Sequence, residues 1–318
     1  MAEFALDFEK PILELETKIA DLKLLNDSGQ TDLLPEINRL EQKHKKLIQK
    51  IYSNLNRWQR VLIARHPKRP YTLDYIKRWS SDFFELHGDR YFGDDKSIVA
   101  GFGTLDGQKV VYIGHQKGKN TKENIYRNFG MSNPEGYRKA LRVMKFAEKY
   151  NRPIICLVDT PGAYPGIESE ERGQAEAIAQ NILQMTMITV PILIIVIGEG
   201  ASGGALGIGI GDRLIMLENT WFSVISPEGC AAILWRDAKQ AEQAADAMKV
   251  TAQDLEEMGI CDRIVSEPLG GAHRDYEMMA DSVKKVILEE LSDLSHFDNE
   301  KLISTRHAKY ESIGSWTE

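Results

Sequence analysis

The chain has 318 residues, 42% hydrophobic and 27% charged, which is typical of a globular protein that can bury a sizeable core. Its formal net charge of −7 argues against nucleic acid as the main partner, although local basic clusters could still hold an anionic ligand. The three cysteines, Cys156, Cys230 and Cys261, are widely spaced, so they predict neither a disulfide framework nor a C-x-x-C zinc site.

The first residues, MAEFALDFEKPILELE, are acidic and lack the apolar segment of a signal peptide. The longest apolar run, VPILIIVIG, is far too short to span a bilayer. The sequence therefore predicts a cytoplasmic protein with no membrane partner.

Residues 8–66 are predicted to be wholly helical. Pro11 suits a first helical turn, apolar residues follow it at helical spacing, and the polar stretch 26–32 interrupts the pattern. A longer helix then carries one apolar stripe from Ile37 to Trp58. The two helices form a hairpin, whose stripe packs either on its partner helix or on another subunit, and the sequence does not decide which.

A boundary is predicted at 65–76, where two prolines interrupt a basic run. We therefore expect an N-terminal helical hairpin over residues 1–70 and a second domain over residues 71–318. Thr72 is the expected N-cap of a helix that extends to about residue 86.

The pattern changes from residue 97 onward. Two apolar stretches flank Asp106-Gly107, which predicts a β-hairpin, and a helix over 133–150 is expected to start with Asn133 as its cap. A buried strand, a glycine-rich turn and a helix then occur in succession twice. The first unit is PIICLVDT, DTPGAYPG and a helix near 170–188, and the second is PILIIVIG, GEGASGG and a short helix near 203–210.

Further strands are expected at RLIMLE, WFSVIS and DRIVSEP, and further helices near 228–235, 237–248, 251–258 and 275–294. This alternation predicts a parallel sheet with helices on its faces, an α/β fold. Ligands of such sheets bind at the carboxyl ends of the strands, where both glycine turns lie.

The second turn fits two well-known patterns. Gly198, Gly200 and Gly203 form G-x-G-x-x-G, and Glu218 follows at the distance of a ribose-binding acid, as in an NAD(P)-dependent oxidoreductase. The helix that follows is short and rich in glycine, however, and this is the second glycine turn of the sheet, which argues against a dinucleotide site.

The same turn also contains G-x-S-x-G around Ser202, the nucleophile elbow of a serine hydrolase. His273, Asp212 and Asp262 could complete a triad. An elbow normally leads into a long helix, whereas two glycines follow Ser202, so we interpret Ser202 as turn structure. Close packing of glycines against the sheet is a further explanation for part of the motif.

A third interpretation fits better. The first N–H groups of a helix have no internal partner, and at Gly203 and Gly204 no side chain would keep an oxygen away from them. Two such N–H groups, together with the helix dipole, form an oxyanion hole built from backbone alone.

The motifs VDTPGAYPG and GEGASGGALG, one strand-turn-helix unit apart, resemble those of the crotonase-like carboxyltransferases. The chain is most similar to the alpha-subunit family of the bacterial acetyl-CoA carboxylase carboxyltransferases, also through GHQKGKNTKENIYRNFGM, SVISPEGCAAILW and EPLGGAHRD. The resemblance runs from residue 7 to about residue 275. It implies a crotonase-like spiral of ββα units behind the N-terminal helical hairpin.

The resemblance also implies a function. With a beta subunit, as an alpha2beta2 assembly, the chain would transfer the carboxyl group of carboxybiotin to acetyl-CoA, forming malonyl-CoA for fatty acid synthesis. Carboxybiotin would arrive on a biotin carboxyl carrier protein, loaded by an ATP-dependent biotin carboxylase. Zinc is expected only in the beta subunit and no metal in this chain. Gly203 and Gly204 would stabilise charge on the ureido oxygen.

Other residues are candidates for binding. The expected biotin pocket consists of Gly162, Ala163, Tyr164, Gly166, Gly200, Ala201 and Ser202. Candidates for a CoA phosphate or an acidic partner are Lys117, Lys119, Lys122 and Arg127. His273 lines the pocket or is structural, and Glu228 is expected to support a helix start.

Overall fold

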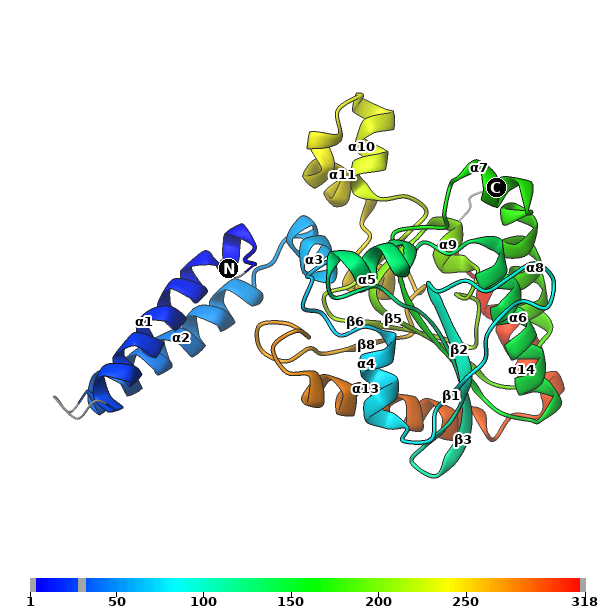
Figure 1. Ribbon diagram of the computed structural model, residues 1–318, viewed down its shortest axis with the longest axis horizontal. Helices are drawn as coiled ribbons and strands as arrows, with labels where there is room; N and C mark the ends of the chain where they lie inside the picture. The colour runs from blue at the N-terminus through cyan, green and yellow to red at the C-terminus, as the bar shows by residue number, and fades with distance from the viewer. Residues whose placement is uncertain (1–3, 28–32, 315–318) are drawn as a thin grey trace.

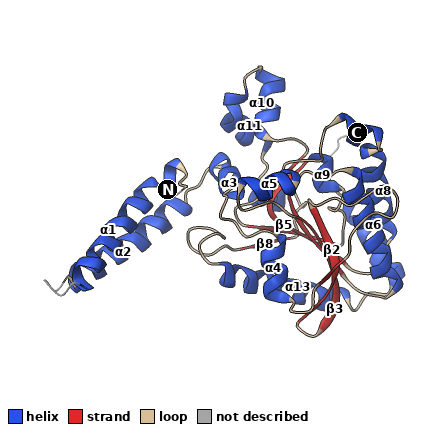
Figure 2. Ribbon diagram, in the orientation of Figure 1, coloured by secondary structure: helices blue, strands red, loops and turns tan. Residues whose placement is uncertain are grey.

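A single twisted sheet lies at the centre of the computed structural model, which describes residues 4–27 and 33–314 (Figures 1 and 2). The strand order is β1-β2-β3-β4-β5-β6-β8, and β7 pairs with β5. The strands are β1 (Phe84–Glu85), β2 (Ile98–Leu105), β3 (Gln108–His115), β4 (Ile154–Thr160), β5 (Ile192–Ala201), β6 (Arg213–Leu217), β7 (Trp221–Ser223) and β8 (Arg263–Val265).

The predicted hairpin and parallel sheet are confirmed. β2 and β3 pair antiparallel across the Asp106-Gly107 turn, and β3, β4, β5 and β6 pair in parallel. β4 and β5 are buried at every position, because helices cover both faces of the sheet.

Alternate residues of the strands enter two separate cores. Ile154, Cys156 and Val158 of β4 pack with residues of α6 (Pro134–Lys149) and α8 (Gln174–Met187) on one face. Ile155 and Leu157 pack with α4 (Thr72–Trp79) and α13 (Tyr276–Leu294) on the other. The remaining helices are α1 (Lys10–Asp27), α2 (Leu34–Tyr52), α3 (Arg57–Ala64), α5 (Thr121–Tyr126), α7 (Ile167–Glu171), α9 (Ser202–Leu206), α10 (Pro227–Trp235), α11 (Ala241–Met248), α12 (Ala252–Glu257) and α14 (Asn299–Glu311).

The N-terminal hairpin projects from the body, with α1 and α2 packed on each other (Figure 1). The predicted break at 26–32 lies mostly outside the described residues. The second helix does not reach Trp58 as predicted: α2 ends at Tyr52 and α3 starts anew at Arg57, because the Asn56 side chain accepts the N–H of Gln59 and caps it.

Three further helices differ from the prediction. α4 starts with Thr72 as its first residue rather than its cap, and ends at Trp79, so that Phe84–Glu85 can pair with β2. The Thr72 hydroxyl donates to the His115 carbonyl at 2.5 Å instead of capping. The helix expected near 170–188 is divided by Gly173, whose φ of 82° is left-handed. α14 was not predicted.

No helix within residues 4–27 and 33–314 is both long and apolar enough to cross a membrane. The division of the chain at residue 70 stays a prediction.

Candidate active site

The two glycine turns meet at the carboxyl ends of β4 and β5, which are neighbours in the sheet. Gly204 lies directly against the backbone of the first turn, and a Cβ there would overlap the amide nitrogen of Ala163 and the carbonyl carbon of Gly162. Glycine is therefore required at 204 for the two turns to touch.

The N–H groups of Gly203 and Gly204 are not used by the fold. α9 begins at Ser202, and Gly207 donates to the Gly203 carbonyl at 2.9 Å. The N–H groups of Gly203 and Gly204 therefore lie in the first helical turn of α9, ahead of the residues that donate hydrogen bonds within the helix. The described residues outside the helix supply no acceptor for either group. Gly203 is half-buried, and a Cβ there would find only Ile178, at 3.6 Å, within 4 Å. The N–H of Gly203 therefore faces an open side, whereas Gly204 is buried against the Gly162–Ala163 turn.

The first turn is held rigidly beside them. The Thr160 hydroxyl lies 2.7 Å from the Gly130 carbonyl oxygen and 2.8 Å from that of Gly162. Tyr164 donates its N–H to the Ser132 carbonyl at 3.0 Å, and the ring of Tyr164 covers Gly166. Of the expected biotin-pocket residues, Gly162 and Ala163 thus contact the α9 start directly through Gly204.

Gly200 and Gly198 have packing roles. A Cβ on Gly200 would overlap the Phe222 ring, and one on Gly198 would overlap the Asp159 carboxylate. Both glycines lie inside β5 rather than in a strand-to-helix loop, so the motif does not adopt the dinucleotide-binding geometry.

Ser202 is exposed and has a φ of 59°, and no hydrogen bond joins its hydroxyl to a histidine among the described residues. His273 instead stacks on His66, with ring centroids 3.9 Å apart, beside Glu9. These positions argue against a serine-histidine pair.

An ionic cluster that the sequence analysis missed lies under the turns. Lys117 Nζ is 2.6 Å from Asp159 Oδ1 and 2.7 Å from Glu199 Oε2. Arg65 donates to the other oxygen of Glu199 at 2.5 Å and also pairs with Glu228, in the first turn of α10. The signal for this cluster was available, since VDT and GEG place a carboxylate at the end of each of two buried apolar strands.

The cluster changes the ionisation of its members. Burial raises the pKa of the Asp159 carboxyl. Burial opposes ionisation of Glu199 as well, but Lys117 and Arg65 outweigh it and lower the pKa of Glu199. The pKa of Lys117 is likewise raised by its two carboxylates in spite of burial.

The four basic candidates do not gather into one site. Lys117 faces two buried carboxylates, which argues against a phosphate contact. Lys119 pairs with Asp74 at 2.5 Å, Arg127 donates to the Lys96 carbonyl at 2.8 Å, and Lys122 is exposed on α5.

An apolar cavity of about 260 Å³ lies beside α9. It is lined by Ser202, Leu206, Phe222, Ser223, Val224, Met248, Lys249, Val250, Leu255, Met258 and Ile260. Ser202 and Leu206 place this cavity next to the free N–H groups, so that a ligand bound to them could rest an apolar ring here.

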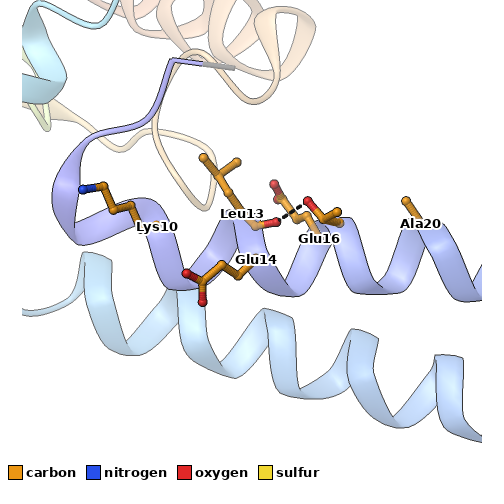
Figure 3. A pocket seen from close by; sticks show the side chains of 6 residues that line it. Lys10, Leu13, Glu14, Glu16 and Ala20 are labelled. Carbon is orange, nitrogen blue, oxygen red and sulfur yellow. Dashed lines mark hydrogen bonds between the residues drawn. The ribbon is translucent and has the colours of Figure 1, made fainter. Parts of the chain in front are cut away.

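A hollow of about 480 Å³ runs along the first half of α1, at the end of the hairpin that adjoins the body (Figures 1 and 3). Two of its polar side chains are already engaged: the Thr17 hydroxyl donates to the Leu13 carbonyl at 2.9 Å, and Glu16 pairs with His44 and Arg274.

A family model described as acetyl co-enzyme A carboxylase carboxyltransferase-like matches residues 5–314. The chain belongs to this family. The resemblance stated from the motifs is thereby confirmed, and the family match extends beyond the motifs through α14.

Curated relatives match over the whole chain. A protein of Chlorobaculum parvum named acetyl-coenzyme A carboxylase carboxyl transferase subunit alpha is 55% identical and covers 100% of this chain and 98% of its own length. A protein of the same name from Listeria monocytogenes serotype 4a is 57% identical, with 97% of each chain covered.

Solved structures share the fold. A transcarboxylase 12S structure with methylmalonyl-coenzyme A bound matches 79% of this chain at 16% identity and a TM-score of 0.56, and this chain spans 43% of that one. A Pseudomonas malonate decarboxylase hetero-tetramer in complex with coenzyme A matches 74% of this chain and 91% of its own, at 18% identity and a TM-score of 0.60. The crotonase-like carboxyltransferase fold, predicted from the motifs, is confirmed.

Proposed function

We propose that this chain is the alpha subunit of an acetyl-CoA carboxylase carboxyltransferase, which moves the carboxyl group of carboxybiotin to acetyl-CoA and yields malonyl-CoA for fatty acid synthesis. The observation that carries the proposal is the pair of N–H groups at Gly203 and Gly204 that the fold does not use, with Gly203 half-buried beside open space and Gly204 backed by the Gly162–Ala163 turn. The full-length relatives supply the reaction by their names.

The chain fits the cofactor by its donors and by the cavity beside them. Two N–H groups suit a single carbonyl oxygen such as that of a ureido ring, and the apolar cavity next to α9 suits the fused ring system. When bound, carboxybiotin would supply an activated carboxyl group. The residues of this chain that would hold it are Gly162, Ala163, Gly203 and Gly204.

The role of the donors follows from where charge develops. The N–H groups of Gly203 and Gly204 would hold the ureido oxygen and stabilise the negative charge that carboxyl transfer places on it. This scheme assigns no side chain of this chain as a base, because the bound biotin ring would supply a nitrogen that can take the proton of the acetyl methyl group.

A second subunit is part of the proposal. Large apolar side chains are exposed on the segments that follow the strands at the edge bearing the glycine turns: Ile125, Phe129, Ile167, Val224, Ile233 and Leu234. We define these six residues as the apolar rim. A zinc-containing beta subunit that brings the acetyl-CoA half of the site would cover it, in a cytoplasmic alpha2beta2 assembly served by the biotin carrier protein and an ATP-dependent biotin carboxylase.

Gly203→Ala tests the oxyanion role in the complex co-expressed with a beta subunit. The methyl group meets no atom of the fold closer than 3.6 Å, so the variant should fold, with a helix stabilised by up to about 1 kcal/mol. Because the methyl crowds the open side of the donors, kcat for decarboxylation of malonyl-CoA with free biotin should fall about 100-fold.

Gly93→Ala is the matched control, since a Cβ there meets nothing within 4 Å, and it should leave kcat unchanged. Full activity in Gly203→Ala would overturn the proposal. Loss of activity in Ser202→Ala alone would instead favour a hydrolase, and binding of NAD(P)H in a titration would favour an oxidoreductase.

A further inference from the structure

β5 contains an irregularity immediately before the second glycine turn. Val158 of β4 pairs with Val196 of β5, but Thr160 pairs with Gly200, so β5 has extra residues between these two pairs. The backbone ladder that aligns the two strands is therefore interrupted just where the strands enter their turns.

Side chains replace the missing ladder bonds. Asp159 Oδ1 accepts the N–H of Glu199 at 3.0 Å, and Arg69 Nε donates to the Ile197 carbonyl at 2.6 Å. Gly198 makes the first contact possible, because any side chain there would displace the Asp159 carboxylate. The alignment of the two turns thus depends on where the Asp159 side chain is held.

Lys117 holds it. Two residues beyond the end of β3, Lys117 bridges Asp159 at 2.6 Å and Glu199 at 2.7 Å. The three side chains are 12%, 1% and 7% exposed, respectively, so these ion pairs are weakly screened. One ammonium therefore connects the ends of three adjacent parallel strands, and two of those strands lead into the glycine turns.

We propose that Lys117 is a positioning residue for carboxyl transfer, which fixes the Gly203 and Gly204 donors relative to the Gly162–Ala163 wall through Asp159 and Glu199. The proposal rests on the proposed function of the glycine pair. Lys117 does not touch the substrate in this scheme. It acts by keeping the donors in register, and a donor displaced by about 1 Å can lose about 100-fold in rate.

A single Lys117→Met substitution would leave two buried carboxylates without their shared cation, and the chain could then fail to fold. The double variant Lys117→Met with Asp159→Asn removes one positive and one negative charge together. The asparagine oxygen can still accept the Glu199 N–H, so the double variant keeps the local charge balance but loses the bridge. Lys145→Met, on the exposed side of α6, is the control.

The measurements use the complex with the beta subunit. We expect the double variant to melt within a few degrees of the wild type, with KM for malonyl-CoA within about twofold, but with kcat at least about 10-fold lower. Amide hydrogen exchange in the peptide 200–206 should be faster. Lys145→Met should match the wild type in all four measurements.

If Lys117 served only to balance charge, the result would differ: the double variant, with a melting temperature like that of the wild type, should also show wild-type kcat and a wild-type exchange rate. That outcome would overturn the proposal. If the wild-type complex lacks the decarboxylation activity, the proposed function fails separately, and the exchange rate of 200–206 still decides whether Lys117 fixes the turn.

Discussion

At the scale of single residues, the glycines of the second turn have different physical reasons to be glycine. Gly198 makes room for a carboxylate and Gly204 for a neighbouring backbone, whereas Gly203 contacts nothing that would exclude a methyl group. A glycine that the fold does not require, at the open side of two free donors, is better explained by a ligand than by packing. The sequence pattern alone could not separate these cases, because it shows the spacing of glycines and not what faces them.

His115 makes stability depend on pH. The ring is fully buried at the end of β3, and burial, with help from the charge of Lys117, lowers the pKa of His115 to about 3. The unfolded chain therefore binds a proton, below about pH 6.5, that the folded chain does not bind until about pH 3. Stability from this group is complete above pH 6.5 and falls as the pH is lowered, by about 2 kcal/mol at pH 5.

Urea unfolding at the two pH values measures this effect. His115→Leu removes the titrating ring, so its loss of stability between about pH 6.5 and 5 should be smaller than that of the wild type by about 2 kcal/mol. Equal losses in the two proteins would show that His115 does not titrate in the way described.

At the scale of elements, strong hydrophobic periodicity located the strands and helices correctly, whereas the capping residues that divide helices were not recognised. The buried strands, the β-hairpin and the helices α6, α10 and α13 follow the sequence pattern closely. The break between α2 and α3 was missed, because the apolar stripe continues in phase from Ile51 to Trp58 although Asn56 starts a new helix. α14 was missed because its sequence is mostly polar and the residue with most of its hydrogen bonds to the body is an arginine, Arg306.

Arg306 anchors α14 by hydrogen bonds, beside the buried Leu302. It is 1% exposed and donates to both oxygens of Asp212 at 2.8 Å, and also to the carbonyls of Met185, Ile188 and Val190. Arg306→Leu should reduce the free energy of unfolding by about 3–5 kcal/mol, because Asp212 is left as a buried, unpaired charge. Chemical denaturation would measure the loss, and Lys285→Leu, at an exposed position of α13, should change stability little. A small effect of Arg306→Leu would show that α14 docks by its apolar residues alone.

At the scale of the whole molecule, the fold presents half of a reaction site at one edge. The helices α9, α10 and α11 lie at the carboxyl edge of the sheet (Figure 1). The residues of the apolar rim belong to segments that follow the strands at this edge, and Arg65 joins β5 to α10 through Glu199 and Glu228. The motifs located this edge from the sequence. The ionic cluster beneath it was not predicted, because its five members come from five distant segments of the chain.

Ile233→Glu tests whether the rim is the contact with the partner. Ile233 is 71% exposed on α10, so the charge should not affect folding of the isolated chain, but it should weaken binding of the beta subunit at least about 10-fold. Met278→Glu, at an exposed apolar residue of α13 on another side, is the control and should bind normally. Affinities from light scattering or calorimetry would decide, and equal binding by the two variants would remove the rim from the interface.

The interrupted pairing between β4 and β5 has a consequence for protein engineering. The segment from Gly200 to Gly204 is not an independent structural unit, since its orientation depends on an aspartate in the neighbouring strand β4 and a lysine beyond the end of β3. Grafting that loop alone onto another parallel sheet should give a scaffold that folds but does not catalyse. A transplant that also carries the three strand ends would bring its own alignment with it.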